Sequence, residues 1–246
     1  ARIISGCADE SVKLVSWIHI EQHTTKRAIA SFRNQKEAVK CYKRFHKIVS
    51  VSKTVEMDFR KILNIDVSYQ VLYNTNESKK IRRLSEESIT IDIDQENTVN
   101  IVGVGKLLKS KGFDRILRIT KQLIAENYSV HTYILGEGPE KEALQNYIKA
   151  NGLGKNITLL GYQINPYKYI SRCDLFVCAS YAEGFSTAAT EALILGVPVC
   201  TVEVSGMKEM LGQNNEYGIV TENSEEALYE GIRCLVKTPE LLRHYK

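Results

Sequence analysis

The chain has 246 residues, 43% of them hydrophobic and 25% charged, with a formal net charge of +4. This length suits one large α/β domain, or one domain and part of another, and no apolar run approaches the roughly 20 residues of a transmembrane helix. The chain starts at Ala1 without an initiator methionine or a signal-peptide pattern, so we expect a piece of a longer cytoplasmic protein.

Cysteine and histidine spacing disfavours a metal site. The six cysteines have no C-x-x-C spacing and lie mostly in apolar segments, as unpaired thiols do in a reducing cytoplasm. The closest pair of histidines, His19 and His23, flanks Glu21 without forming an H-E-x-x-H motif. We therefore expect no protein-bound metal.

The first 76 residues predict half of a Rossmann-like domain. Apolar segments at 12–18, 47–51 and 69–72 are strand candidates, and the segments 35–45 and 54–63 have helical patterns. A complete sheet of this type needs more strands, so 1–76 is predicted to be a partial N-terminal domain. The polar segment 77–98 is predicted to be an interdomain linker.

Positive charge is concentrated in this first part. Residues 26–61 contain 11 Lys and Arg against 3 Asp and Glu, so their net charge is +8 and that of the rest of the chain is −4. The segment suits a face turned to an anionic membrane or acceptor, or simply a solvated helix face. Nucleic-acid binding is not favoured, because aromatic residues are not interleaved with the charge and no reader motif is present.

Residues 99–246 predict a second domain, in which short apolar strands alternate with helical patterns. The strand candidates are 99–104, 130–135, 157–160, 175–179, 197–202 and 217–220. Buried apolar strands separated by helices are typical of a doubly wound parallel sheet, so the predicted fold class is α/β with a Rossmann-like C-terminal domain.

The segment Glu183-Gly-Phe-Ser-Thr-Ala-Ala-Thr-Glu191 places two carboxylates around the first turn of a predicted helix, 187–195. Gly196 and Pro198 end that helix. Its N-terminus offers unpaired N–H groups and the positive end of the helix dipole to an anion, while the two glutamates suit sugar and ribose hydroxyls. Two surface glutamates at this spacing also arise by chance, so the pair alone does not decide the function.

Together with the following Gly-Val-Pro-Val, this segment resembles the family 4 retaining glycosyltransferases. Further matching motifs lie at 102–113, 135–139, 160–162, 173–180 and 205–209. The resemblance implies a two-domain GT-B fold in which 1–76 is part of the acceptor-side domain and 99–246 is the donor-binding domain. The donor would be a nucleotide diphosphate sugar, UDP- or GDP-linked, bound without a metal. The resemblance also implies a hexosyltransferase-type reaction with retention of anomeric configuration.

The resemblance also assigns roles to residues. Lys106, where the family usually has Arg, and Lys111 would bind the diphosphate, Gly105 and Gly136 would approach the donor, and Tyr162 would line the base. Glu191 would hold the ribose, and Glu183 the transferred sugar. His19 would orient the reacting groups. Backbone N–H groups would bind the phosphate and the sugar, and they belong to Gly184, Phe185, Ser186 and Thr187. The predicted catalytic residues are Glu183, Lys111, Lys106 and His19.

The predicted function is transfer of a sugar to a glycan, lipid-linked or other glycoconjugate acceptor at the cytoplasmic face of a membrane, in polysaccharide or glycoconjugate synthesis. One alternative is a GT-B nucleotide-sugar epimerase, which would reuse the nucleotide cleft. Another is a non-catalytic nucleotide-sugar-binding subunit, which the lysine at position 106 would permit. Product analysis separates these alternatives. The sequence does not indicate an oligomeric state.

Overall fold

The computed structural model describes residues 1–93 and 97–246 and consists of two compact units. The first unit comprises 1–75 together with the short loop 182–185, and the second comprises 76–181 and 186–246. Each unit has its own hydrophobic core.

The first unit contains a three-stranded parallel sheet in the order β1-β2-β3. Its strands are β1 (Val15–Ile18), β2 (Lys47–Ser50) and β3 (Ser68–Val71). Its helices are η1 (Ile4–Gly6), α1 (Thr25–Ala28), α2 (Gln35–Tyr42) and α3 (Lys53–Leu63). The predicted strands and both predicted helices are therefore confirmed, although β1 is shorter than the apolar segment that predicted it.

Helix α3 covers one face of this sheet because its apolar residues recur at helical spacing. Val55, Phe59 and Leu63 are buried and pack in a core with Ile48 of β2. The opposite face is more open, since Trp17 of β1 is 47% exposed.

The second unit is built on a six-stranded, all-parallel sheet in the order β6-β5-β4-β7-β8-β9. The strands are β4 (Val99–Val104), β5 (Val130–Leu135), β6 (Ile157–Gly161), β7 (Leu175–Cys178), β8 (Val199–Val202) and β9 (Ile219–Thr221). All six predicted strands and the doubly wound arrangement are confirmed. Strands β5, β7 and β8 are buried along their whole length, as parallel strands covered on both faces should be.

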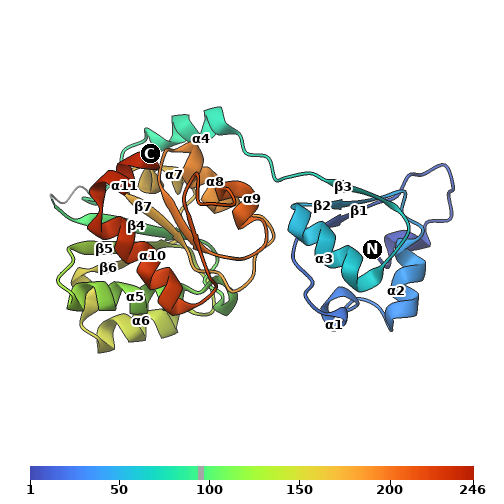
Figure 1. Ribbon diagram of the computed structural model, residues 1–246, viewed down its shortest axis with the longest axis horizontal. Helices are drawn as coiled ribbons and strands as arrows, with labels where there is room; N and C mark the ends of the chain where they lie inside the picture. Colours follow the sequence, from blue (N-terminus) through green and yellow to red (C-terminus); the bar gives the residue numbers. More distant parts are fainter. Residues whose placement is uncertain (94–96) are drawn as a thin grey trace. The chain divides into compact units, whose positions relative to one another are not determined.

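Helices cover both faces of this sheet. The longer helices are α4 (Ser78–Ser85), α5 (Phe113–Ala125), α6 (Lys141–Ala150), α8 (Thr187–Ile194) and α10 (Glu225–Lys237). The shorter ones are η2 (Lys109–Lys111), η3 (Leu153–Lys155), α7 (Tyr167–Ile170), α9 (Met207–Leu211) and α11 (Pro239–His244). Helix α5 packs against α6 and α10, whereas α4 packs against α7 and α8 on the other face (Figure 1). None of the helices in the described ranges is long and apolar enough to cross a membrane.

Part of the segment predicted to be a linker is instead structured. Helix α4 lies within 77–98 and belongs to the second unit, where Ile81 is buried and Asn165 donates its side-chain amide to the Leu84 carbonyl at 2.8 Å. A single buried isoleucine among Lys, Arg, Ser and Glu gives little periodicity, so the composition suggested a linker. Residues 94–96 of the predicted linker lie outside the described residues.

Candidate functional site

The second unit has a switch point between β4 and β7. From β4 the chain adds β5 and β6 on one side of the sheet, then returns to add β7, β8 and β9 on the other. The loops that leave the carboxyl ends of β4 and β7 therefore diverge. In open α/β sheets a ligand binds in the crevice formed there.

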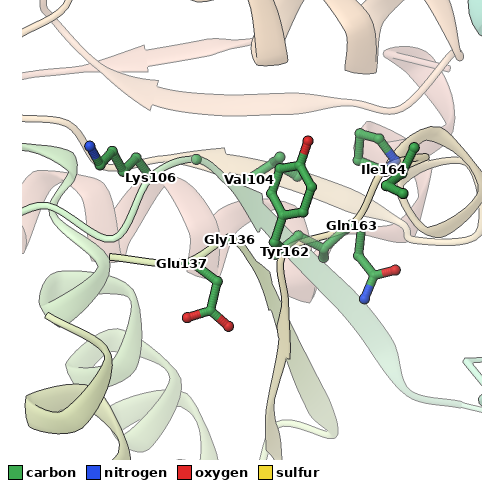
Figure 2. Close-up of a pocket in the computed structure, with 10 residues that line it drawn as sticks. Val104, Lys106, Gly136, Glu137, Tyr162, Gln163 and Ile164 are labelled. Atoms are coloured by element: carbon green, nitrogen blue, oxygen red, sulfur yellow. The ribbon is translucent and has the colours of Figure 1, made fainter. Parts of the chain in front are cut away.

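A cavity of about 560 Å³ opens at the carboxyl ends of β4, β5 and β6. Its lining residues are Val104, Gly105, Lys106, Leu135, Gly136, Glu137, Tyr162, Gln163, Ile164 and Pro166. Four of these were predicted to bind the donor: Gly105, Lys106, Gly136 and Tyr162. In Figure 2 the Tyr162 ring and the Lys106 chain extend to one side of the strand ends, whereas the Glu137 carboxylate and the Gln163 amide point to the other.

Tyr162 is the most prominent side chain of this cavity. It directly follows Gly161, the last residue of β6, and is 72% exposed. An aromatic ring this exposed has little role in packing and is available to stack on a planar ligand. The neighbouring Gln163 is held back against its own strand, because its amide donates to the Leu160 carbonyl at 2.7 Å.

The N-terminus of α8 is formed by Ser186 and Thr187. The Ser186 hydroxyl oxygen accepts from the Ala189 amide at 3.3 Å, and the Ser186 carbonyl accepts from the Thr190 amide at 3.2 Å. Buried Ser186 thus serves as the helix N-cap, whereas Thr187 is exposed. The amides of Thr187 and Ala188 precede the first intrahelical bond, so they can be offered to an anion.

Glu191 lies one turn into α8 and is half-buried. Tyr167, in the first turn of α7, donates its hydroxyl hydrogen to Glu191 Oε1 at 3.2 Å. Burial raises the pKa of Glu191, and the hydrogen bond from Tyr167 acts in the opposite direction. Tyr167 was not among the predicted site residues; the only local signal for it is the Asn165-Pro166 pair, which predicts a helix start directly before it.

Lys111 lies on the β4 side of the switch point, at the end of η2, and does not line the cavity. The loop that carries it is joined to the loop after β7, because the Tyr181 amide donates to the Ser110 carbonyl at 2.8 Å. Four further predicted residues belong to the second unit but do not line the cavity: Lys111, Ser186, Thr187 and Glu191.

The other predicted residues belong to the first unit. His19 directly follows β1, and its ring stacks with that of Trp17 at a centroid distance of 6.0 Å. Gly184 lies so close to the His19 carbonyl that a Cβ at position 184 would overlap it. Phe185 packs against the first core, and its carbonyl accepts from the Asn74 amide at 3.1 Å. Glu183 therefore sits in a loop anchored beside the end of β1.

Metal-binding side chains are not clustered in the described ranges. No group of three or more His, Cys, Asp and Glu there could hold a metal ion. The Glu21 and His23 side chains pair with each other, with Oε2 and Nε2 2.9 Å apart. Independence from metal stays a prediction.

Residues 86–246 match the family model described as "Glycosyl transferases group 1". The chain belongs to this family. Over 179 residues, the chain is 32% identical to the N-acetylgalactosamine-N,N'-diacetylbacillosaminyl-diphospho-undecaprenol 4-alpha-N-acetylgalactosaminyltransferase of Campylobacter jejuni; the match covers 72% of this chain and 47% of that protein. It is 25% identical over 143 residues to the capsular polysaccharide biosynthesis glycosyltransferase CapM of Staphylococcus aureus; this match covers 56% of this chain and 37% of CapM. The chain thus spans about half the length, or less, of these relatives.

Solved structures share the fold of this group 1 glycosyltransferase chain. A variant of TarM from S. aureus, crystallised with fondaparinux, alpha-GlcNAc-glycerol and UDP, has a TM-score of 0.79 at 18% identity over 98% of this chain and 47% of TarM. Anabaena HepE, in complex with UDP and glucose, has a TM-score of 0.75 at 19% identity over 96% of this chain and 65% of HepE. The predicted GT-B fold class is confirmed.

Proposed function

We propose that the polypeptide containing this chain transfers a hexose from a UDP- or GDP-linked donor, with retention, to a glycan or lipid-linked acceptor. The observation that carries the proposal is that the part of the second unit matched by the family model contains a cavity, a helix N-terminus and a half-buried carboxylate. These features suit the base, the diphosphate and the ribose of such a donor.

The nucleoside end of the donor is assigned to the cavity and to α8. The exposed Tyr162 ring supplies a stacking surface for the base. Glu191 accepts hydrogen bonds from the ribose hydroxyls, with one carboxylate oxygen already oriented by Tyr167. A half-buried carboxylate loses little hydration on binding, so its hydrogen bonds contribute more than those of an exposed one.

The diphosphate is assigned to Lys106, Lys111 and the first amides of α8. During transfer the bond between the anomeric carbon and the β-phosphate oxygen breaks, and the acceptor oxygen bonds to the anomeric carbon as its hydroxyl proton is lost. Negative charge then accumulates on the departing diphosphate, where cations and N–H groups lower the barrier. Lysine at 106 supplies charge without the bidentate geometry of arginine.

The sugar and acceptor are assigned to the first-unit loop. Glu183 provides a carboxylate for sugar hydroxyls, Gly184 and Phe185 provide backbone N–H groups, and His19 is placed to orient the reacting hydroxyl. The support is local geometry: the loop at 182–185 is anchored on the His19 carbonyl and on Asn74.

Nucleotide stabilisation tests the donor assignment. We expect one of UDP, GDP, ADP and CMP to raise the melting temperature of the chain selectively, because a ligand that binds only the folded state stabilises it. The shift should be lost in Glu191→Ala and kept in Glu142→Ala, which removes an exposed carboxylate from α6. If no nucleotide at millimolar concentration stabilises either the chain or the longest natural polypeptide containing it, the donor assignment is wrong.

Product analysis tests the reaction itself. Incubation of the longest polypeptide with the selected nucleotide sugar and lipid-linked or glycan acceptors should yield a glycosylated acceptor whose anomeric configuration matches the donor. Interconversion of free nucleotide sugars would instead indicate an epimerase. Nucleotide binding without any turnover would indicate a binding subunit.

A peripheral contact with an anionic membrane is the second part of the proposal. Lys36, Lys40 and Lys43 are exposed along one stripe of α2 and its C-terminus, and together with Gln35 and Val39 they line a surface groove of about 590 Å³. Arg44, in contrast, is used internally, because its guanidinium donates to the carbonyls of Ser5 and Cys7. The stripe therefore suits acidic lipid headgroups in the cytoplasmic leaflet.

Vesicle sedimentation tests this contact. Replacing the three lysines of the stripe with glutamine should weaken binding to phosphatidylserine vesicles about 10- to 100-fold at low salt. The same three-charge change at exposed lysines of the second unit, Lys121, Lys149 and Lys237, should have little effect. Equal losses in the two triple variants would show that only net charge matters.

A further inference from the structure

Arg115, near the start of α5, is a buried cation to which the proposed function gives no role. It is the third residue of the helix, and only 6% of it is exposed. Its Nη1 donates to Asn223 Oδ1 at 2.8 Å and to the Ala179 carbonyl at 3.3 Å. The guanidinium also lies over the Tyr181 ring, 3.7 Å from its centroid. Burying a guanidinium is costly unless its N–H groups find acceptors, and Asn223, the Ala179 carbonyl and the Tyr181 ring meet this need.

Two of the three partners of Arg115 belong to the loop that leaves β7 at the switch point. Ala179 and Tyr181 lie in that loop, and Asn223 lies between β9 and α10. Arg115 therefore joins three segments that are far apart in the sequence. Its guanidinium fixes both a carbonyl and an aromatic ring of the β7 loop.

The same two residues of the β7 loop contact the loop that carries Lys111. The Tyr181 amide donates to the Ser110 carbonyl at 2.8 Å. Gly112, with φ +65°, lies so close to the Ala179 carbonyl that a Cβ at position 112 would overlap it. The residues on both sides of Lys111 thus rest on the backbone that Arg115 holds.

Arg118, one turn further along α5, provides a contrast. It forms ion pairs with Glu225 and Asp114, and its side chain is 37% exposed. Glu225 lies in α10 and Asp114 in α5, so Arg118 joins these two helices and leaves the β7 loop to Arg115. Asp114 also pairs with Lys109 of η2 at 3.2 Å, so Arg118 controls for the loss of an α5 arginine near the same segment. It is a matched control on the same helix.

We propose that Arg115 is a positioning residue for diphosphate binding: by fixing Ala179 and Tyr181 it sets the place of the 110–112 backbone and hence of Lys111. This assignment rests on the proposed function. It predicts that Arg115 affects nucleotide affinity only through Lys111, whereas a residue that merely stabilises the unit would act independently of Lys111.

A double-mutant cycle tests the assignment. The affinities of the parent, Arg115→Met, Lys111→Gln and the double variant are measured by calorimetry for the selected nucleoside diphosphate, at a temperature where all four are folded. We expect Arg115→Met to weaken binding about 10-fold in the parent and less than about 2-fold in the Lys111→Gln background, because coupled residues are not additive. Arg118→Met should leave the affinity unchanged.

Two further variants guard against a trivial folding defect. Arg115→Lys, which keeps the charge but not the planar contact with Tyr181, should recover part of the lost affinity. Asn223→Ala removes one exposed partner and should cause a smaller loss in the same direction, again only when Lys111 is present.

The assignment is overturned by equal losses in the two backgrounds, or by a Lys111→Gln variant that binds as well as the parent. Nucleotide binding by the parent would still support the proposed function in both cases, but the second result would also remove Lys111 from the residues assigned to the diphosphate. A parent that binds no nucleoside diphosphate overturns the proposed function as well as the role of Arg115.

Discussion

At the residue scale, the candidate site depends on polar side chains that the fold removes from water. Glu191 is half-buried with a raised pKa, and Tyr167 is its hydrogen-bond donor. Such a pair is pre-organised, because the carboxylate is already oriented when a ribose arrives. The glutamate was predictable from its motif, but its partner belongs to a different helix and was not.

The first prediction concerns this pair. Tyr167→Phe removes the bond that lowers the pKa of Glu191 while burial persists, so the pKa should rise further above the parent value. Nucleotide affinity should fall about 3- to 10-fold at neutral pH, and more steeply as pH decreases, because the protonated carboxyl accepts ribose hydrogen bonds poorly. Calorimetry at pH about 7.5 and about 5.5 measures both effects.

Tyr147→Phe, on α6, is the control for removal of a tyrosine hydroxyl. It should reproduce the affinities of the parent at both pH values. An unchanged pH profile in Tyr167→Phe would mean that the bond does not tune Glu191.

The second prediction concerns His131 of β5, whose Nε2 lies 2.8 Å from Thr158 Oγ1 and whose ring stacks on Tyr133. Burial lowers the pKa of His131 below its usual value of 6.5. Below 6.5 the unfolded chain therefore binds a proton that the folded chain resists, and the free energy of unfolding falls as pH decreases towards the folded-state pKa.

Urea unfolding between pH about 7.5 and about 5 tests this effect. His131→Gln should lose less stability over the same range than the parent, because the other four histidines contribute equally to both proteins. Parallel pH profiles for the two proteins would exclude His131 as the cause.

At the element scale, three helices begin with a serine whose hydroxyl accepts from the amide three residues later. Ser52 caps α3, Ser186 caps α8 and Ser224 caps α10. The caps are local features, so the starts of these helices follow from the sequence. Any further role of an N-cap, beyond starting its helix, depends on what the first turn of that helix faces.

The third prediction compares two of these caps. Ser186→Ala and Ser224→Ala should each lower the free energy of unfolding by about 1 kcal/mol. Only Ser186→Ala should also weaken nucleotide binding, because a frayed first turn of α8 disperses the Thr187 and Ala188 amides. Calorimetry and urea unfolding of both variants decide this, and equal nucleotide affinities would separate α8 from the donor site.

Element positions were largely predictable because hydrophobic periodicity reports burial. Helix α5 shows both the success and its limit. Its apolar stripe, including Ile116, Leu117 and Leu123, is buried as the spacing predicts. Arg115 is buried with it, four residues before buried Ile119, because the loops after β7 and β9 supply acceptors that periodicity does not reveal. The four-residue spacing of Arg115 and Ile119 puts both on one face of α5, and this spacing is a sequence signal that could have pointed to Arg115.

At the scale of the whole molecule, the chain has two separate cores. Phe59 lies in the first and Phe176 in the second, and each is only 1% exposed. The chain contains one tryptophan, Trp17, which belongs to the first unit. Its fluorescence can therefore report on the first unit alone.

The fourth prediction uses this reporter. Phe59→Ala and Phe176→Ala each create a cavity that should cost about 3–5 kcal/mol of stability in its own unit. Trp17 fluorescence should show unfolding at lower urea concentration in Phe59→Ala and be nearly unchanged in Phe176→Ala. Equal shifts would mean that the two units unfold as one, and circular dichroism confirms that Phe176→Ala destabilises the second unit.

The division of the chain into units departs from the order of the sequence at one place. The loop at 182–185 follows β7 of the second unit but packs with the first, through Gly184 on His19 and Phe185 on the first core. Of the predicted site residues, Glu183, Gly184 and Phe185 therefore belong with His19. The sequence motif, which is continuous through Glu191, did not reveal this.

The sequence by itself determined the α/β class, the parallel sheet, the starts of α2, α3 and α8, and the family, because periodicity, capping and motif order are local properties of the chain. The tertiary structure alone decided that α4 is part of the second unit, that Tyr167 meets Glu191, and that Arg115 joins Ala179 to Asn223. The last of these contacts spans 108 positions between Arg115 and Asn223. Contacts of this kind depend on strand order and loop geometry, which local hydrophobic patterns do not encode.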